Sequence, residues 1–184
     1  MELNDDVYKD LLGICLVDNK KLPYITTKID IAYLPMGIYR MIYSAILDLY
    51  NIGVDVDIVT VSKKSDAVII AVGETWRMNG EAGARVNIEL LPHEVELINK
   101  VYEHNKNIVL IVTAGRPLVL TNVIDKVKGL IITFYLGMTT GEVLYEAISG
   151  KTTPSAKLTM SFPRHVGQLP ISYDSYPTGR PKEK

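Results

Sequence analysis

Two carboxylates and an arginine lie close together in one short polar stretch of this 184-residue chain. An apolar run, Ala67–Val72, stops at Gly73-Glu74, and the loop after it carries Glu81 four residues before Arg85. The run is too short to cross a membrane and is typical of a buried strand. Because ligands of open α/β sheets bind beyond the carboxyl ends of the strands, a carboxylate in this loop is a candidate for acid–base chemistry.

The part of the chain after Ser65 alternates short apolar runs with segments of helical pattern. A helix is predicted from Pro92, a favoured first helical residue, to His104. The apolar runs predict four strands, at residues 67–72, 108–113, 130–135 and 158–162, with further helical segments at 122–128 and 141–148. Strands separated by such helices favour βαβ units. We therefore expect an α/β fold, with a small helical segment followed over residues 64–184 by a partial, mostly parallel α/β sandwich of about four strands.

Residues 1–63 have a different pattern and are expected to form the separate helical segment. An apolar stripe predicts a helix over Val7–Val17, and a stronger stripe predicts a helix from about Gly37 to Ile52. Gly53 fits the C′ position that ends the second helix. The residues that follow, 54–61, alternate apolar and polar side chains as a strand does.

Composition and charge narrow the classes of function. Hydrophobic residues make up 47% of the chain and charged residues 22%, a balance typical of globular proteins. The net charge of −1 indicates neither direct binding to nucleic acid nor binding to an anionic membrane. The single cysteine, Cys15, lies in an apolar pattern and indicates a buried, inert thiol in a reducing compartment. The acidic N-terminus has no signal-peptide pattern, so a cytoplasmic location is expected.

No cofactor and no metal is predicted. The three histidines, His93, His104 and His165, stand apart without the spacing of metal ligands. Residues Gly150-Lys151-Thr152 resemble the end of a phosphate-binding loop, but Tyr145 occupies the position of the earlier glycine that such a loop requires. The pattern therefore argues against nucleotide binding.

Five blocks in the second half occur together in a fixed order. They are SDAVIIAVGE, MNGEAGAR, AGRPL, TPSAKLTMSFPRHVGQLP and YPTGRP, spread over residues 64–184. On these blocks the segment resembles the C-terminal α/β sandwich domain of the family-3 glycoside hydrolases, of the β-glucosidase and β-xylosidase types. The departures from the family pattern lie in loops: the usual Asn-Gly-Arg-Pro is Ala-Gly-Arg-Pro at 114–117, the loop FYLGMTTGE lacks a double glycine, and Ala156 replaces a glycine.

The resemblance implies hydrolysis of a glycosidic bond by a retaining mechanism with two carboxylates. In that family an aspartate of an N-terminal barrel domain is the nucleophile, and a glutamate in a loop of the sandwich domain is the acid/base. By motif that glutamate is Glu81, with Arg85 completing the E-x-x-x-R pattern. It protonates the glycosidic oxygen and then acts as a base toward water. The same loop offers Trp76 and Met78 as an apolar wall for a sugar, and Arg85 to hold a sugar hydroxyl or to anchor the loop.

Each of these residues also has a simpler interpretation. Glu81 on a glycine-flanked loop can be a solvated surface carboxylate, and Trp76 can be a packing residue. Glu74 is interpreted as an organiser of the loop at the strand end, and Arg116 as a structural residue that pairs with backbone or carboxylates. A barrel that supplies the nucleophile is not recognised in the sequence, so we expect activity on β-glucosides only together with a barrel-domain chain.

Two blocks in the first half, LLGICLVDNKKL and IYRMIYSAILDLYNIGVDVDIVTV, carry a second resemblance. Over residues 8–61 they are similar to the N-terminal helical domain of DnaB-type replicative DNA helicases. This resemblance implies an alternative function, a protein-interaction module that self-associates through its N-terminal helices, and the meeting of the two resemblances near Lys63 points to a chimera. It also implies that Asp57 caps a further helix, IVTVSKK, in place of the strand-like alternative.

Overall fold

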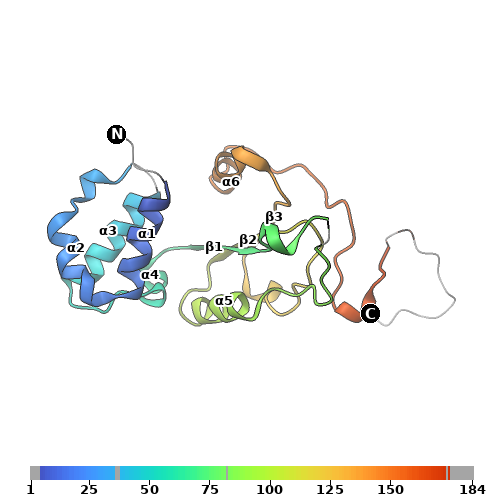
Figure 1. The fold of residues 1–184 in the computed structure, drawn as a ribbon, viewed down its shortest axis with the longest axis horizontal. Coiled ribbons are helices and arrows are strands. Elements are labelled where there is room, and N and C mark those ends of the chain that lie inside the picture. The colour runs from blue at the N-terminus through green and yellow to red at the C-terminus, as the bar shows by residue number, and fades with distance from the viewer. Residues whose placement is uncertain (1–4, 36–37, 82, 173, 175–184) are drawn as a thin grey trace. The chain divides into compact units, whose positions relative to one another are not determined.

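The structure is a computed structural model that describes residues 5–35, 38–81, 83–172 and 174 (Figure 1). The sequence block YPTGRP, residues 176–181, lies outside the described residues. The chain divides into two compact units, one formed by residues 1–68 with 100–107 and the other by residues 69–99 with 108–184. Within the described residues, no helix is long and apolar enough to cross a membrane.

The first unit is helical, as the sequence predicts. It contains α1 (Asp5–Val17), α2 (Leu22–Lys28), α3 (Ile38–Asn51) and α4 (Ile58–Lys64). Helices α1 and α3 pack against each other, because the apolar stripes that predict them face inward. The core they share is made of Leu12, Cys15, Leu22, Ile25, Leu34, Tyr43, Ile46, Leu49 and Val56.

Helix α3 ends at a glycine in the left-handed region. Gly53 has φ +72°, its N–H donates to the carbonyl of Tyr50 at 3.0 Å, and the N–H of Val54 donates to the carbonyl of Leu49 at 3.1 Å. This pair of bonds is the Schellman motif, which satisfies the last carbonyls of a helix. The predicted C′ role of Gly53 is confirmed.

Residues 58–64 form a helix, although residues 54–61 alternate apolar and polar side chains as a strand does. Asp57 Oδ1 accepts from the N–H of Thr60 at 2.7 Å, and Thr60 Oγ1 accepts from the N–H of Asp57 at 2.9 Å. This reciprocal capping box gives a partner to two backbone N–H groups at the start of the helix. In a strand these N–H groups would need partners on a neighbouring strand. The capping residue therefore overrides the alternating pattern, and the strand-like alternative is wrong.

Cys15 is buried in the first unit beside Tyr43. Its side chain has no exposed surface, and burial raises the pKa of the thiol above its ordinary value of 9.0. The Tyr43 hydroxyl donates to the carbonyl of Ile29 at 3.0 Å. Burial raises the pKa of Tyr43, and negative charge on Cys15 and Asp30 raises it further. The predicted burial of Cys15 is confirmed.

The second unit is built on a three-stranded sheet with the order β1-β2-β3. The strands are β1 (Val68–Gly73), β2 (Ile108–Thr113) and β3 (Gly129–Ile132), and β2 pairs with β3 in parallel, with Leu110 opposite Leu130. Helix α5 (Pro92–His104) connects β1 to β2, and α6 (Thr140–Ile148) follows β3. Figure 1 shows α5 along one face of the sheet and α6 on the other side. The predicted α/β fold class is confirmed.

A glutamate joins the start of α5 to the end of β1. Glu94 is the third residue of the helix that Pro92 begins, and its Oε2 accepts from the N–H of Leu91 at 2.8 Å. Its Oε1 accepts from the N–H of Gly73, also at 2.8 Å. One carboxylate therefore caps the helix and fixes the strand end against it.

Two expected elements differ in the structure. Residues 158–162 do not form a strand, and the helix expected at 122–128 contracts to a 3₁₀ turn at Ile124–Lys126. No side chain of α6 is buried, and Leu158 is 57% exposed. Leu158 and Phe162 line a cavity together with Leu130 and Ile132 of β3, so this segment lies near β3 without pairing with it as a strand. The run Leu158–Phe162 has the composition of a strand but lacks a pairing partner.

Candidate active site

The carboxyl end of β1 lies very close to β2, and this closeness explains why Gly73 is a glycine. Gly73 has φ +137°, and a Cβ at this position would lie 1.9 Å from the carbonyl oxygen of Thr113. The next residue, Glu74, donates its backbone N–H to the same carbonyl at 2.8 Å. Only a residue without a side chain fits here, so the strand ends at Gly73 and Glu74 begins the loop.

The side chain of Glu74 is completely buried and is compensated by three neighbours. Its Oε1 accepts from Arg85 Nη1 at 2.7 Å and lies 3.2 Å from Arg116 Nε, which pairs with it by charge without hydrogen-bond geometry. Its Oε2 accepts from Asn79 Nδ2 at 2.6 Å. A buried carboxylate is tolerated only when charged and hydrogen-bonding partners replace water. We call Glu74, Asn79, Arg85 and Arg116 the Glu74 network.

Arg116 holds the Glu81 loop by its backbone. Its Nη2 donates to the carbonyl of Met78 at 3.0 Å and to the carbonyl of Gly83 at 2.9 Å, so it binds the loop on both sides of Glu81. Arg85 Nη2 in turn donates to the carbonyl of Glu89 at 3.1 Å. The predicted structural role of Arg116 is confirmed, because its partners are backbone carbonyls and the carboxylate of the network.

A second glycine leaves room for the network. A Cβ on Gly115 would lie 2.5 Å from Asn79 Nδ2 and 2.6 Å from Asn79 Oδ1. The amide of Asn79 therefore lies directly over the bare Cα of Gly115. This contact requires the glycine of the AGRP block, while Arg116 of the same block supplies a cation to Glu74.

The end of β3 also reaches the network. Thr133 is buried and its hydroxyl lies 2.8 Å from the hydroxyl of Thr113 at the end of β2. Phe134 adopts φ +47°, and the hydroxyl of Tyr135 accepts a hydrogen bond from Asn79 Nδ2 at 2.9 Å. Side chains from the ends of β1, β2 and β3 therefore meet at one edge of the sheet, the edge where ligands of parallel sheets bind.

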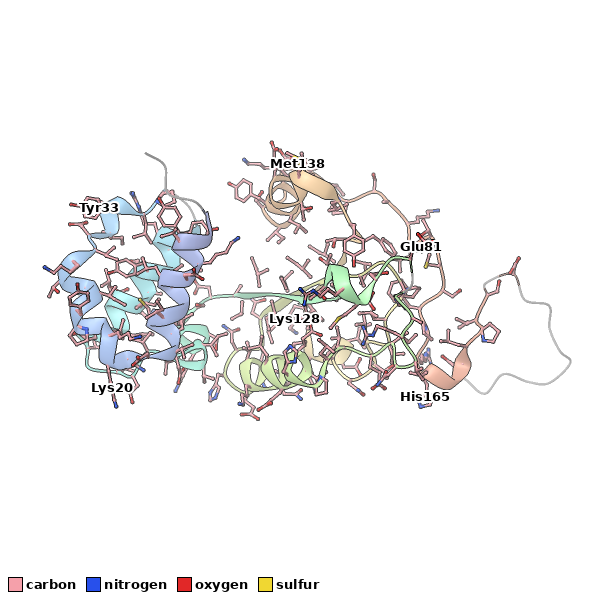
Figure 2. The ribbon with its side chains drawn as sticks, in the orientation of Figure 1. Lys20, Tyr33, Glu81, Lys128, Met138 and His165 are labelled. Carbon is pink, nitrogen blue, oxygen red and sulfur yellow. The ribbon has the colours of Figure 1, made fainter. Side chains whose placement is uncertain are left out.

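The predicted site residues occupy different positions relative to this network. Glu81 is exposed, and its carboxylate has no hydrogen bond or ion pair to any residue that the structure describes. Figure 2 shows Glu81 on the loop beyond the strand ends. Arg85 points inward to Glu74, which supports the loop-anchoring interpretation of that residue. Met78 is half-buried at the end of a 3₁₀ turn, Trp76–Met78, and the side chain of Trp76 lies outside the described part of the structure.

Asn79 and Tyr135 are two residues of this site that the sequence does not predict. Asn79 belongs to the MNGEAGAR block, where an Asn-Gly pair indicates only a turn. Tyr135 lies in the apolar run that predicts a strand at residues 130–135, whereas β3 ends at Ile132. Contact between these two residues depends on the parallel order of β1 and β3, and no local pattern in the sequence carries that information. Among the residues that the structure describes, no cluster of His, Cys, Asp or Glu could hold a metal ion.

The comparisons with known proteins agree with this geometry. The model of the glycosyl hydrolase family 3 C-terminal domain matches residues 37–184. The chain belongs to this family. The match to the family 3 C-terminal domain begins ahead of α3, so it includes two helices of the segment that resembles the helicase domain. The helicase resemblance itself stays a prediction.

Individual relatives match about two thirds of this chain. A "Beta-xylosidase" of Formosa agariphila is 35% identical over 115 residues, 62% of this chain and 16% of the relative. A "Periplasmic beta-glucosidase" of Salmonella typhimurium is 36% identical over 123 residues, 67% of this chain and 16% of the relative. The chain thus spans about a sixth of the length of these two relatives.

A solved structure supports the fold directly. The β-glucosidase of Listeria innocua matches with a TM-score of 0.65 and 33% identity, over 68% of this chain and 17% of that one. The same enzyme matches equally in complexes described with glucose and with isofagomine. The edge of the sheet described above therefore belongs to a domain whose relatives are named as β-glucosidases and a β-xylosidase.

Proposed function

We propose that this chain acts in the hydrolysis of β-glucosides or β-xylosides as the domain that presents the general acid/base, Glu81. The retaining mechanism needs a second carboxylate on the other side of the scissile bond. In this proposal the nucleophile comes from a barrel domain outside these 184 residues, so the chain by itself does not turn over substrate.

One observation carries the proposal: the residues that flank Glu81 are bound to the same buried carboxylate. Asn79, two residues before it, and Arg85, four residues after it, both donate to Glu74. Glu81 is thus held between two fixed points and remains exposed. A catalytic acid needs this combination, because it must be positioned by its surroundings and must still contact the substrate.

The chemistry assigned to Glu81 has two steps. The carboxylic acid donates its proton to the glycosidic oxygen as the bond between that oxygen and the anomeric carbon breaks and the nucleophile bonds to the anomeric carbon. The resulting carboxylate then takes a proton from water, whose oxygen attacks the anomeric carbon and releases the nucleophile. The proton lost in the first step is regained in the second, so Glu81 ends in its starting state.

The test is reconstitution of hydrolysis. The chain is co-expressed with the nucleophile-bearing barrel domain of a family 3 relative, and release of p-nitrophenol from an aryl β-glucoside is measured. General acid–base catalysis contributes roughly 10²–10⁴ in rate, so Glu81→Gln is expected to lower kcat by that factor. Glu103→Gln, an exposed glutamate of α5, is the matched control and should leave kcat unchanged. Equal rates for both variants would contradict the role of Glu81.

A second candidate function rests on the surface of α1. Val7, Ile14 and Val17 are 46%, 41% and 86% exposed, and their spacing places them on one stripe of the helix, opposite the buried face. We propose that this stripe supports self-association of the chain. Two copies that pack their stripes together would bury these apolar side chains in a two-fold interface. Light scattering tests it: the wild-type chain should be larger than a monomer, and Ile14→Glu should be monomeric. A monomeric wild-type chain would contradict this candidate.

A further inference from the structure

We propose that Tyr135 is a sugar-binding residue of this site, and that its hydroxyl donates a hydrogen bond to a hydroxyl group of the pyranose on which Glu81 acts. This inference rests on the proposed function and deepens it. It assigns a ligand contact to a residue that belongs to no block used to identify the site.

Tyr135 lies next to the Glu81 loop in the fold. The residue follows β3 by three positions and lies at the same sheet edge as Glu74 and Thr113. Asn79 Nδ2 binds Tyr135 at 2.9 Å, and Asn79 is two residues from Glu81. The loop after β3 and the Glu81 loop are therefore joined at the edge where open α/β sheets bind their ligands.

The backbone directly before Tyr135 is strained. Phe134, with φ +47°, is the one non-glycine residue with a positive φ among the residues that the structure describes. For an L-residue the left-handed region costs about 1–2 kcal/mol, and such strain concentrates at ligand-binding positions that the surrounding structure holds in place. Here the strained residue directly precedes Tyr135, whose hydroxyl is fixed by Asn79.

The hydroxyl of Tyr135 accepts a hydrogen bond from the protein and keeps its own proton for a ligand. A phenol can donate one hydrogen bond and accept others, and the bond from Asn79 uses only its acceptor side. Among the described residues, none accepts a hydrogen bond from the Tyr135 hydroxyl. Tyr135 is 54% exposed. The hydroxyl is thus anchored on the protein side and free to donate on the solvent side. A sugar hydroxyl, which accepts as well as donates, matches this arrangement.

The experiment uses the full chain, labelled with 3-fluorotyrosine and titrated with methyl β-D-glucopyranoside. The fluorine resonance of Tyr135 is assigned from the signal that Tyr135→Phe removes. The expected result is a saturable shift of this resonance, with glycerol giving none. Unlabelled Tyr135→Phe, followed by calorimetry, should bind the glucoside about tenfold more weakly, the effect of one lost hydrogen bond. Tyr33→Phe, at an exposed tyrosine of the first unit, is the control and should bind like wild type.

The outcomes separate this inference from the proposed function. Equal affinity of wild type and Tyr135→Phe for the glucoside would overturn the hydroxyl contact. Binding that is lost in Tyr135→Ala but kept in Tyr135→Phe would also overturn it, because the sugar would then stack on the ring. Absence of saturable binding to the wild-type chain would overturn it too. If Tyr135→Phe weakens binding while Glu81→Gln leaves reconstituted hydrolysis unchanged, the sugar site stands and the catalytic role of Glu81 falls. Unchanged thermal unfolding of Tyr135→Phe shows that the variant is folded.

Discussion

Asn79 donates its side-chain amide to Glu74 Oε2 at 2.6 Å and to the hydroxyl of Tyr135 at 2.9 Å. One side chain therefore joins the loop after β1 to the loop after β3. Because Asn79 lies two residues before Glu81, this pair of bonds also fixes one side of the loop that carries the proposed acid/base. The buried Glu74 carboxylate is the common anchor of the site.

Removing the charge of Glu74 is expected to destabilise the second unit strongly. Glu74→Gln leaves Arg85 and Arg116 without their buried counter-charge, and breaking a buried pair in this way costs roughly 3–5 kcal/mol. Urea unfolding followed by the fluorescence of the single tryptophan measures it. Glu81→Gln is the control and should stay within about 0.5 kcal/mol of wild type, because Glu81 is exposed and unpaired within the described residues. Equal stability of the two variants would contradict the anchor role.

A methyl group on Gly115 is expected to displace Asn79. The added Cβ would lie 2.5 Å from Asn79 Nδ2, and overpacking of this kind costs roughly 1–3 kcal/mol. Gly141→Ala in helix α6 has open space at its Cβ and should instead stabilise by up to about 1 kcal/mol. In a double-mutant cycle, Asn79→Ala should remove most of the cost of Gly115→Ala. Strictly additive effects would show that the two residues are not in contact.

Replacing Phe134 by glycine is expected to raise the stability of the second unit. Glycine adopts φ +47° without the cost of about 1–2 kcal/mol that an L-residue meets there. Gly137→Ala is the opposite control, since Gly137 has φ +76° with open space around its Cα and should lose about the same amount. Thermal unfolding measures both changes. A loss of stability in Phe134→Gly would mean that contacts of the ring outweigh the strain.

The sequence determines the helices and the strands of this fold more clearly than their ends. The strand at residues 108–113 is predicted to the residue, because an apolar run is bounded on both sides by polar turns. Periodicity alone does not show whether residues 58–64 form a helix or a strand. The capping box formed by Asp57 and Thr60 stabilises the helix. The fourth strand was expected from composition alone, and composition does not supply a pairing partner.

The candidate site is predictable only in part for a similar reason. Glu81 and Arg85 share one loop, so their motif is readable along the chain. The contact of Asn79 with Tyr135 joins residues 56 positions apart and follows from the order of the strands in the sheet. The burial of Glu74 likewise depends on Arg116, which comes from the loop after a different strand.

The stability of the first unit is expected to fall at alkaline pH. Folding raises the pKa of Cys15 above 9.0 and that of Tyr43 above 10.0, so both groups favour the protonated, folded state. Their contribution is complete below the unfolded pKa values and is lost as the pH rises through the folded ones. Urea unfolding between about pH 8 and 10.5 should show this decline, and Cys15→Ala should make it shallower. A decline that Cys15→Ala leaves unchanged would contradict the role of the thiol.

The most direct test of the proposed function is the product that the Glu81→Ala variant makes in the presence of azide. The measurement uses the chain reconstituted with a family 3 barrel domain and a 2,4-dinitrophenyl β-glucoside, whose leaving group needs no proton. Azide can attack the anomeric carbon of the glycosyl-enzyme without a general base. The bond from that carbon to the nucleophilic carboxylate then breaks, and the sugar leaves as β-glucosyl azide. With Glu81 as the acid/base, azide accelerates the variant, and β-glucosyl azide appears in the NMR spectrum. Hydrolysis by Glu81→Ala at the wild-type rate, with glucose as the only product, would contradict the assignment.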